Sequence, residues 1–415
     1  MKNLKTIIAC LLCLPLLAHA QKERVTIESL ASHSTQCGQG VAAAFAGQTN
    51  GTLMIAGGCN FPDMPAAEGG QKKFYDSAWY LGKKGWYKTT FALPRPVAYG
   101  AYVNYDNNGV ICIGGTDGKQ SLTDVYRLTD KNIKPLSSLP VGIEQAAAAY
   151  ANGTIYLVGG QTNGKAQMEV YSLSVARGHD DSNWVRITNL PGAARLQPTA
   201  VVQTNGLDQS LWVFGGYDPT DGKIADEVLE LNLKTMEWAS HPQGRATVGM
   251  TAVASGYSHV LFFGGVNKEV FEKAVAGEFG DSYLSHPAPW YQFNPDILVY
   301  PTITDSWYAM PGSSLLARAG AGLVKVGDSY VLLDGESKPG IRASEVMKVS
   351  FHKETRFGML NWIVLVLYLM AMLGLGVFFM RREGGSDDFF RGGGRVPWWA
   401  AGISIYATML SAITY

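Results

Sequence analysis

The chain has 415 residues, of which 34 are basic, 34 are acidic and 48 are glycine. The balanced charge argues against a nucleic-acid partner, because phosphate binding needs a surplus of Lys and Arg. Roughly 330 residues lie between two apolar ends, which is more than an ordinary domain of about 100–200 residues and favours two domains or one repeat architecture.

Residues 1–20 have the pattern of a secretory signal peptide. Two lysines precede an apolar run from Ile7 to Leu17, and small residues follow at Ala18 and Ala20. A run of this length is too short to cross about 30 Å of hydrocarbon. We therefore expect cleavage after Ala20 and export of the mature chain.

Between the apolar ends, one strand pattern recurs. Five apolar stretches end in a glycine pair, and the sixth, SYVLLDG, has Asp334 in place of the first glycine. The pairs begin at Gly57, Gly114, Gly159, Gly215 and Gly264. A small-residue strand precedes each pair and alternating strands follow it, which is the period-two signal of β-structure. Four strands repeated around a ring predict an all-β fold, a six-bladed β-propeller over residues 21–357. The two-glycine motif resembles the kelch repeat.

The sixth copy stops after its third strand, at Phe351. At the other end of the chain, RVTIESLAS (Arg24–Ser32) matches the outer-strand pattern. We expect this segment to complete the last blade. N-terminal and C-terminal strands would then close the propeller together and remove its last unpaired edge.

A long insertion, Asn267–Asp296, interrupts the fifth copy. We expect it to form a short helix and a loop over one face, because long loops in compact folds are often lids or walls of a site. The alternative is a solvated excursion without such a role.

Three of the five cysteines, Cys37, Cys59 and Cys112, follow the signal peptide. An odd number allows one disulfide with a free thiol, or three separate buried thiols. Their spacing matches no metal site, so we expect neither a metal nor another cofactor in the propeller.

The composition changes after Phe357. Trp362–Met380 carries no charged residue, and at about 1.5 Å per residue such a helix is long enough to cross a bilayer. We predict a transmembrane helix at 358–381, an arginine-containing cytoplasmic loop at 382–396 and the start of a second helix at 397–415, where a multi-pass protein is cut short. The positive-inside rule then places the propeller in the periplasm, anchored to the lipid of the cytoplasmic membrane.

The tail GSDDFFRGGGRVPWWAAGISIYATMLSAITY resembles the first helices of the sodium:solute symporter family. In that family the corresponding helix belongs to an inverted-repeat core and helps to hold sodium. The resemblance implies a sodium ion for the transporter part, close to Ala407, Thr408 and Ser411. It assigns no individual sodium ligand.

Arginines recur in the loops that precede the innermost strands of the predicted blades. They are Arg95, Arg195, Arg245 and Arg318. If they converge on the axis, they predict an anionic ligand, because arginine binds carboxylates in bidentate fashion. The alternative is that each is a strut bonded to loop carbonyls.

The stretch GESKPGIR, together with HVLFFGGVNKEVF in the preceding copy, resembles the N-acetylneuraminate epimerase group of kelch proteins over nearly all of residues 25–351. In that group the acid of the G-E-x-K-P-G-x-R motif is the proton acceptor, and its arginine is also essential. The resemblance implies catalytic roles for Glu336 and Arg342 and a sialic acid, N-acetylneuraminate, as substrate. The motif usually lies in an interior blade, so its place in the last blade implies a circular permutation.

Those residue types suit the exchange of sialic acid anomers, in which the anomeric hydroxyl loses a proton and the ring oxygen gains one. A positioned carboxylate serves as general base and typically gains about 10²–10⁴-fold in rate. Arg342 stays charged and is expected to hold the substrate carboxylate. The proton donor stays open between a tyrosine, Lys338 and water, and Lys338 is also a candidate substrate contact. Alternatively, Glu336 and Arg342 only pair across a turn.

Two other classes of function compete with the isomerase. A copper-radical oxidase on a kelch propeller needs a Cys–Tyr crosslink with Tyr and His ligands, and the seven histidines show no such set. A non-catalytic sugar-binding domain that delivers ligand to the transporter would use the same arginines.

Overall fold

Strands dominate the part of the chain that the structure describes. This computed structural model describes residues 23–33, 39–105, 108–175, 182–242, 244–353 and 359–381. The signal peptide, the cytoplasmic loop and the second membrane helix that the sequence predicts lie outside these ranges. The chain divides into two units, and Val25–His352 forms one of them.

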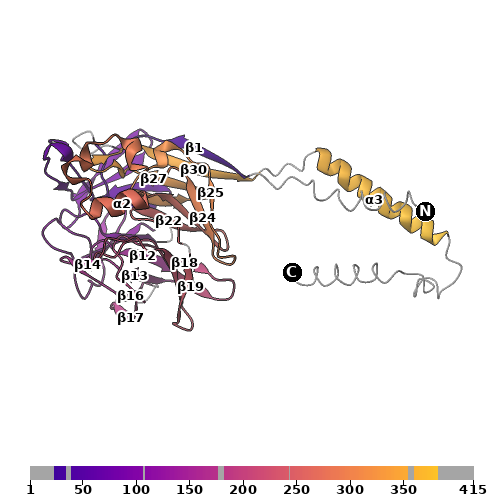
Figure 1. The fold of residues 1–415 in the computed structure, drawn as a ribbon, viewed down its shortest axis with the longest axis horizontal. Coiled ribbons are helices and arrows are strands. Elements are labelled where there is room, and N and C mark those ends of the chain that lie inside the picture. The colour runs from indigo at the N-terminus through magenta and orange to yellow at the C-terminus, as the bar shows by residue number, and fades with distance from the viewer. Residues whose placement is uncertain are drawn as a thin grey trace. The chain divides into compact units, whose positions relative to one another are not determined.

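Within these ranges the strands form six four-stranded antiparallel sheets, the blades of a β-propeller (Figure 1). Each blade is given from its inner to its outer strand. Blade 1 holds β2 (Phe45–Thr49), β3 (Thr52–Ala56), β6 (Ser77–Gly82) and β7 (Gly85–Ala92). Blade 2 holds β8 (Ala101–Asn104), β9 (Val110–Ile113), β10 (Val125–Leu128) and β11 (Ile133–Pro135). Blade 3 holds β12 (Ala147–Ala151), β13 (Thr154–Val158), β16 (Glu169–Ser174) and β17 (Val185–Asn189).

The remaining blades follow the same order. Blade 4 holds β18 (Thr199–Thr204), β19 (Gln209–Phe214), β20 (Glu227–Asn232) and β21 (Trp238–Pro242). Blade 5 holds β22 (Met250–Ser255), β23 (His259–Gly264), β24 (Ile297–Pro301) and β25 (Tyr308–Met310). Blade 6 holds β26 (Gly322–Val326), β27 (Ser329–Leu333), β30 (Val346–Lys353) and, from the N-terminus, β1 (Glu23–Ser29). The predicted six-bladed propeller is confirmed.

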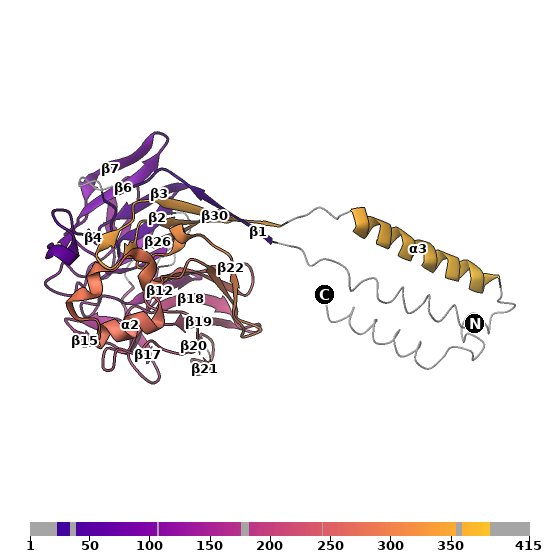
Figure 2. The ribbon, with the colours of Figure 1, turned by 45° about the horizontal axis from the view of Figure 1, so that its top comes forward.

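The inner strands surround a common axis, because each one lies against the inner strands of the two neighbouring blades. Figure 2 shows β2 and β26 side by side, although they belong to the first and last blades. The hydrophobic core lies between adjacent blades. Ile111 and Ile113 of blade 2, for example, belong to the same buried cluster as Ile155 and Leu157 of blade 3.

The glycine pairs mark the point where each blade meets the next. The first glycine of the second pair, Gly114, has φ +57°, and a Cβ built there would lie 2.2 Å from the carbonyl oxygen of Ile143 in the following blade. Glycine tolerates both the left-handed backbone and the close approach. The repeat therefore keeps glycine where neighbouring blades come into contact.

The N-terminal strand closes the propeller, as predicted. β1 pairs with β30, and the backbone continues the contact through Leu30 N, which donates to Val346 O at 2.8 Å, and His33 N, which donates to Ser344 O at 2.8 Å. Val25 and Ile27 of β1 pack on a buried cluster shared by blades 5 and 6. In Figure 1 the indigo β1 lies beside the orange β30. The observed strand begins and ends slightly earlier than the predicted Arg24–Ser32.

The buried side chain of Asp334 stabilises this closure by hydrogen bonds to the N-terminal segment. Its Oδ2 accepts a hydrogen bond from Val41 N at 2.9 Å and lies 2.8 Å from Nδ1 of His33, and both the Asp334 and His33 side chains are 1% exposed. Asp334 has φ +52°, so it adopts the same left-handed conformation as the glycines that it replaces. Asp is among the residues that tolerate this region. The aspartate in the sixth copy therefore ties the N-terminal segment to blade 6.

Short elements lie in the loops that follow some of the glycine pairs, which we call the joints of the blades; in blade 6 the joint is Asp334–Gly335. Two-stranded hairpins follow the joints of blades 1, 3 and 6, and η2 (Ala66–Glu68) lies within the first of them. The hairpins are β4 (Cys59–Asn60) with β5 (Lys73–Phe74), β14 (Gln161–Thr162) with β15 (Lys165–Ala166), and β28 (Glu336–Lys338) with β29 (Ile341–Arg342). A further short helix, η5 (Ser314–Leu316), precedes the inner strand of blade 6.

The insertion in blade 5 forms the predicted short helix and loop. It contains α2 (Lys268–Val275), η3 (Gly280–Ser285) and η4 (Ala288–Tyr291). Asn267 caps α2, because its side chain accepts a hydrogen bond from Val270 N at 3.0 Å. Glu272 of α2 accepts from Ile224 N at 3.0 Å and so ties the helix to blade 4.

A separate helix, α3 (Met359–Met380), follows the propeller in the chain. In the part of the chain that the structure describes, no helix is both long enough and apolar enough to cross a membrane. The transmembrane helix expected at 358–381 stays a prediction.

Candidate active site

Glu336 begins a short hairpin that follows the joint of blade 6. It lies on β28 directly opposite Arg342 on β29, with the turn made by Gly340 at φ +84°. One carboxylate oxygen of Glu336 accepts hydrogen bonds from Gly340 N at 2.8 Å and from Nη1 of Arg342. The hairpin therefore fixes a carboxylate and a guanidinium side by side, with the carboxylate partly exposed.

Arg342 is anchored more deeply than its partner. Its side chain is 2% exposed, its Nε donates to Cys59 O at 3.2 Å in blade 1, and its guanidinium lies 5.3 Å from the ring centre of Phe61. Burial lowers the pKa of Arg342, but its electrostatic interactions with Glu336, Cys59 and Tyr99 raise it by more, so the net pKa lies above its usual value. A fixed, permanently charged guanidinium is suited to binding a carboxylate.

Tyr99 of blade 2 brings a hydroxyl to the same region. Its oxygen accepts a hydrogen bond from Nζ of Lys72 at 3.1 Å and lies 3.8 Å from Sγ of Cys59. Burial raises the pKa of Tyr99 well above its usual value, electrostatic interactions with Cys59 and Glu336 raise it further, and the interaction with Arg342 lowers it. Tyr99 therefore lies within electrostatic reach of both Glu336 and Arg342.

The blade 5 insertion forms a wall beside the hairpin. Nζ of Lys338 donates to His286 O at 2.8 Å, and the hairpin strand β28 contacts η4. Burial, the neighbouring Tyr291 and the charge of Glu336 raise the pKa of Tyr283 to about 12. The insertion thus lies against the candidate site, which supports the interpretation as a site wall over that of a solvated excursion.

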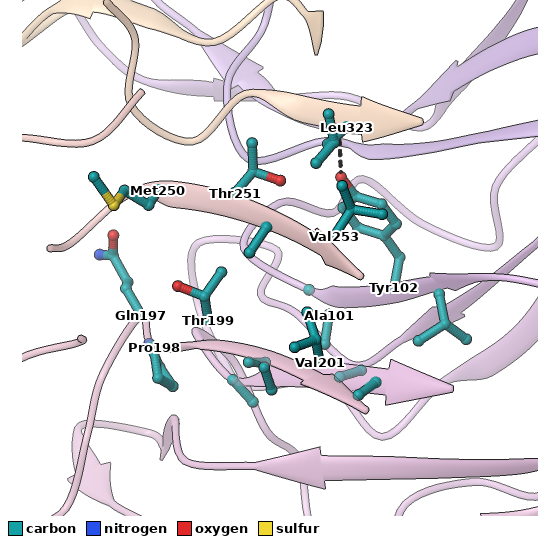
Figure 3. A pocket seen from close by; sticks show the side chains of 18 of the residues that line it. Ala101, Tyr102, Gln197, Pro198, Thr199, Val201, Met250, Thr251, Val253 and Leu323 are labelled. Carbon is teal, nitrogen blue, oxygen red and sulfur yellow. Dashed lines mark hydrogen bonds between the residues drawn. The ribbon is translucent and has the colours of Figure 1, made fainter. Parts of the chain in front are cut away.

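A cavity of about 420 Å³ follows the axis of the propeller. Residues from all six blades line it, and most are small or apolar. In Figure 3, Thr199 and Val201 of β18 and Thr251 and Val253 of β22 border this cavity, and Tyr102 accepts a hydrogen bond from Leu323 N at 2.8 Å. Its volume lies in the range of about 300–1,000 Å³ that small-molecule sites occupy.

One end of the cavity is bordered by six equivalent residues, which we call the mouth ring. All have positive φ and lie one or two residues before the inner strands: Ala43, Tyr99, Gln145, Gln197, Gly249 and Gly320. Backbone hydrogen bonds link them from blade to blade, for example Tyr99 N to Ala43 O at 3.0 Å and Gln145 N to Tyr99 O at 2.8 Å. A polar cavity of about 490 Å³ opens at this mouth and is lined by Lys72, Tyr99 and Gln145, among others.

A family model described as N-acetylneuraminate epimerase matches residues 16–135 and 136–365. The chain belongs to the N-acetylneuraminate epimerase family. Curated relatives of that name include the protein of Vibrio vulnificus (strain YJ016), 28% identical over 236 residues, which are 51% of this chain and 58% of the relative. The protein of Pasteurella multocida (strain Pm70) is 29% identical over 49% of this chain and 56% of the relative.

A third epimerase, from Escherichia coli O9:H4 (strain HS), is 29% identical over 53% of this chain and 61% of its own length. The chain therefore spans less than two thirds of these curated relatives. Among solved structures, that of YjhT superposes with a TM-score of 0.55 at 17% identity and covers 78% of this chain and 99% of YjhT. At this identity the likeness concerns the fold, which is the propeller described above.

The structure does not bring the four predicted arginines of this epimerase family member together on the axis. Arg195 is buried and donates to Glu227 O at 3.2 Å and to the Glu227 carboxylate at 3.0 Å, within its own blade. Arg318 is also buried and donates to Glu345 O at 2.6 Å and to Asp334 O at 3.0 Å. Neither of these two arginines lines the axial cavity, and each guanidinium is already bonded to backbone carbonyls of its own blade.

The other two arginines also lie apart from the hairpin. Nε of Arg95 pairs with the Asp124 carboxylate at 3.0 Å, at the start of the third strand of its own blade, and Arg245 is exposed. The strut interpretation that the sequence left open is therefore favoured at Arg195 and Arg318, which bond backbone carbonyls. A carboxylate at or just before the third strand, about 30 residues after the arginine, follows Arg95, Arg195 and Arg318 in the sequence and was a signal for such bonding within the blade.

Sequence reasoning brought Glu336, Arg342 and Lys338 to one hairpin, and the structure places them there. It missed Tyr99 and Lys72, which precede the hairpin by more than 200 residues in the chain. The signal was a bulky aromatic at a repeat position where the other copies have Ala, Gln or Gly. Cys59 and Cys112 are free thiols, and Cys37 lies outside the described residues.

Proposed function

We propose that this epimerase family member is a mutarotase that interconverts the anomers of N-acetylneuraminate. The observation that carries the proposal is the Glu336–Arg342 pair, held face to face on one hairpin between the insertion and blade 1. An acidic sugar whose carboxylate sits on the reacting carbon needs both a base and an anion clamp. This pair supplies them at one place.

In the proposed reaction, Arg342 binds the substrate carboxylate, and this fixes the anomeric carbon beside Glu336. Arg342 is suited to this because its own Nε is already engaged with Cys59 O, so the guanidinium cannot swing away. When the substrate carboxylate takes a place on the guanidinium, Glu336 is released to accept the proton of the anomeric hydroxyl. The ring then opens, the carbonyl rotates and the ring closes on the other face.

The proposal is tested by proton NMR of freshly released α-N-acetylneuraminate with the purified protein. We expect the α signal to convert to β faster than in buffer alone, in proportion to protein concentration. Binding of the sugar without faster exchange supports the alternative of a non-catalytic sugar-binding domain. If the protein neither binds the sugar nor accelerates exchange, both the mutarotase proposal and the sugar-binding alternative are contradicted.

Arg342→Lys tests the clamp separately. Lysine keeps the charge but loses the planar fork that binds a carboxylate through two hydrogen bonds. We expect KM for N-acetylneuraminate to rise about tenfold or more, which corresponds to about 1.4 kcal/mol or more of lost binding. An unchanged KM contradicts the role of Arg342 as the carboxylate clamp.

We further propose that residues 358–415 anchor the propeller to the cytoplasmic membrane, on its periplasmic side, as the start of a sodium-coupled transporter. The uncharged stretch Trp362–Met380, the arginines after it and the resemblance of the tail to sodium:solute symporters support this. A short connection would keep the mutarotase beside the transporter mouth and raise the local concentration of the accepted anomer. Sodium-dependent uptake of sialic acid by the full-length protein tests it, and uptake indifferent to sodium contradicts it.

A further inference from the structure

Tyr99 is the one aromatic among the six mouth-ring residues, and its backbone is in an unusual conformation. It has φ +58°, where the corresponding residues of blades 5 and 6 are Gly249 and Gly320. A bulky residue in the left-handed region is an outlier, and such residues concentrate at functional sites, where the surroundings hold them in place. Here the backbone hydrogen bonds of the mouth ring hold Tyr99 on both sides.

In the described part of the chain, the hydroxyl oxygen of Tyr99 accepts hydrogen bonds and its hydrogen has no acceptor. Nζ of Lys72 lies 3.1 Å from this oxygen, and an ammonium group can only donate. The thiol of Cys59 lies 3.8 Å away, and Cys59 also accepts at its carbonyl from Nε of Arg342. A chain of contacts therefore runs from Glu336 through Arg342 and Cys59 to the Tyr99 hydroxyl.

Tyr99 also faces the space where a substrate fits. It lines both the axial cavity and the polar cavity of about 490 Å³ at the mouth. Lys338, by contrast, is committed to His286 O at 2.8 Å. Because burial raises the pKa of the Tyr99 hydroxyl, the phenol keeps its proton at neutral pH.

We propose that Tyr99 donates the proton to the ring oxygen of the substrate, and that Lys72 is a positioning residue that orients its hydroxyl. This inference rests on the proposed function. As Glu336 takes the proton of the anomeric hydroxyl, a carbonyl forms at the anomeric carbon and the bond to the ring oxygen breaks. The electron pair of that bond goes to the ring oxygen, which takes the Tyr99 proton and leaves a phenolate beside the Lys72 ammonium.

Ring closure runs these steps in reverse on the other face of the carbonyl. The chain hydroxyl attacks the carbonyl carbon, its proton returns to the Tyr99 phenolate, and the carbonyl oxygen takes back the proton held by Glu336. Both side chains end in their starting forms, so no other reactant is needed. Lys72 and Arg342 stabilise the transient phenolate by their charge.

The test is Tyr99→Phe, which removes only the hydroxyl. We expect the saturated rate of anomer exchange to fall about 10²-fold or more, with KM changed less than about threefold. Tyr126→Phe is the matched control, because the buried Tyr126 hydroxyl belongs to the core of blades 1 and 2 and has no hydrogen-bond partner among the described residues. Exchange by Tyr99→Phe at the parental rate overturns the inference.

A second measurement holds even if Tyr99→Phe folds poorly. Incorporation of 3,5-difluorotyrosine at position 99 makes the phenol more acidic, so the alkaline limb of the pH–rate profile should move to lower pH. Lys72→Met should move it to higher pH, because the phenolate loses a neighbouring cation. An alkaline limb that neither change moves contradicts the assignment.

The outcomes separate this inference from the proposed function. If Glu336→Gln abolishes exchange while Tyr99→Phe leaves it intact, the proposed function stands and Tyr99 is not the donor. If the parent protein does not accelerate exchange at all, the proposed function fails and the donor role fails with it.

Discussion

Asp334 and Glu336 are carboxylates separated by one glycine, and the fold gives them opposite environments. Asp334 is 1% exposed and bonded to His33 and Val41 of the N-terminal segment. Glu336 is partly exposed, with its side chain at 26%, and faces Arg342 across a two-strand hairpin. Gly335, at φ +97°, turns the chain between them. Neighbouring residues of one motif can thus serve closure and chemistry separately.

The largest expected effect on stability comes from removing the N-terminal segment to which Asp334 is bonded. Deletion of residues 23–33 takes away β1 and His33, and it leaves the buried carboxylate without its side-chain partner. We expect the free energy of unfolding to fall by about 5 kcal/mol or more, from the broken buried pair and the lost burial of Val25 and Ile27. Urea unfolding measures it. An unchanged free energy of unfolding contradicts closure by the N-terminus.

Asp334→Gly is the next largest change, and it restores the glycine pair of the other five copies. We nevertheless expect it to lower the free energy of unfolding by about 3 kcal/mol, because both hydrogen bonds of the carboxylate are lost. The reverse exchange, Gly215→Asp, should also destabilise, because its Cβ would lie 2.9 Å from Ala246. If Asp334→Gly is as stable as the parent, the hydrogen bonds of Asp334 to the N-terminal segment do not stabilise the fold.

The contrast between Asp334 and Glu336 also shows which features could be predicted from the sequence alone. The blades, their closure and the Glu336 hairpin follow from alternating strands, glycine pairs and one local motif. The role of Asp334 does not, because its partner His33 is 301 residues away in the chain. Tyr99 was missed for the same reason, since only ring closure brings blade 2 near the blade 6 hairpin. Local patterns predict elements, and contacts across the ring need the fold.

Substitution of a buried arginine that bonds backbone carbonyls should lower the free energy of unfolding by a smaller amount. Arg195→Gln removes charged hydrogen bonds to Glu227 in a buried place, so we expect a loss of about 2 kcal/mol in the free energy of unfolding. The exposed Arg245→Gln is the control and should change it by less than about 0.5 kcal/mol. Exchange rates per folded molecule should stay at the parental value in Arg195→Gln. A raised KM instead would restore Arg195 as a substrate contact.

The smallest effect is a pH dependence. Burial raises the pKa of Asp334 above its usual 3.8, despite the opposing effects of His33, Val41 N and Arg318. A carboxyl with a raised folded-state pKa contributes stability that is complete below about pH 3.8 and is lost as pH rises through the folded pKa. The stability of the parent relative to Asp334→Asn should therefore decrease from pH 4 towards neutrality. A difference that is constant or grows with pH contradicts this.

The central claim is that Glu336 performs the chemistry while Asp334 only holds the fold. The direct measurement is the rate of N-acetylneuraminate anomer exchange per folded molecule, by proton NMR, for Glu336→Gln and Asp334→Asn side by side. Gln keeps the shape of Glu336 and removes the base, so its rate should fall by about 10²–10⁴-fold, and that of Asp334→Asn should match the parent. A parental rate in Glu336→Gln, or an equal loss in both variants, would contradict the claim.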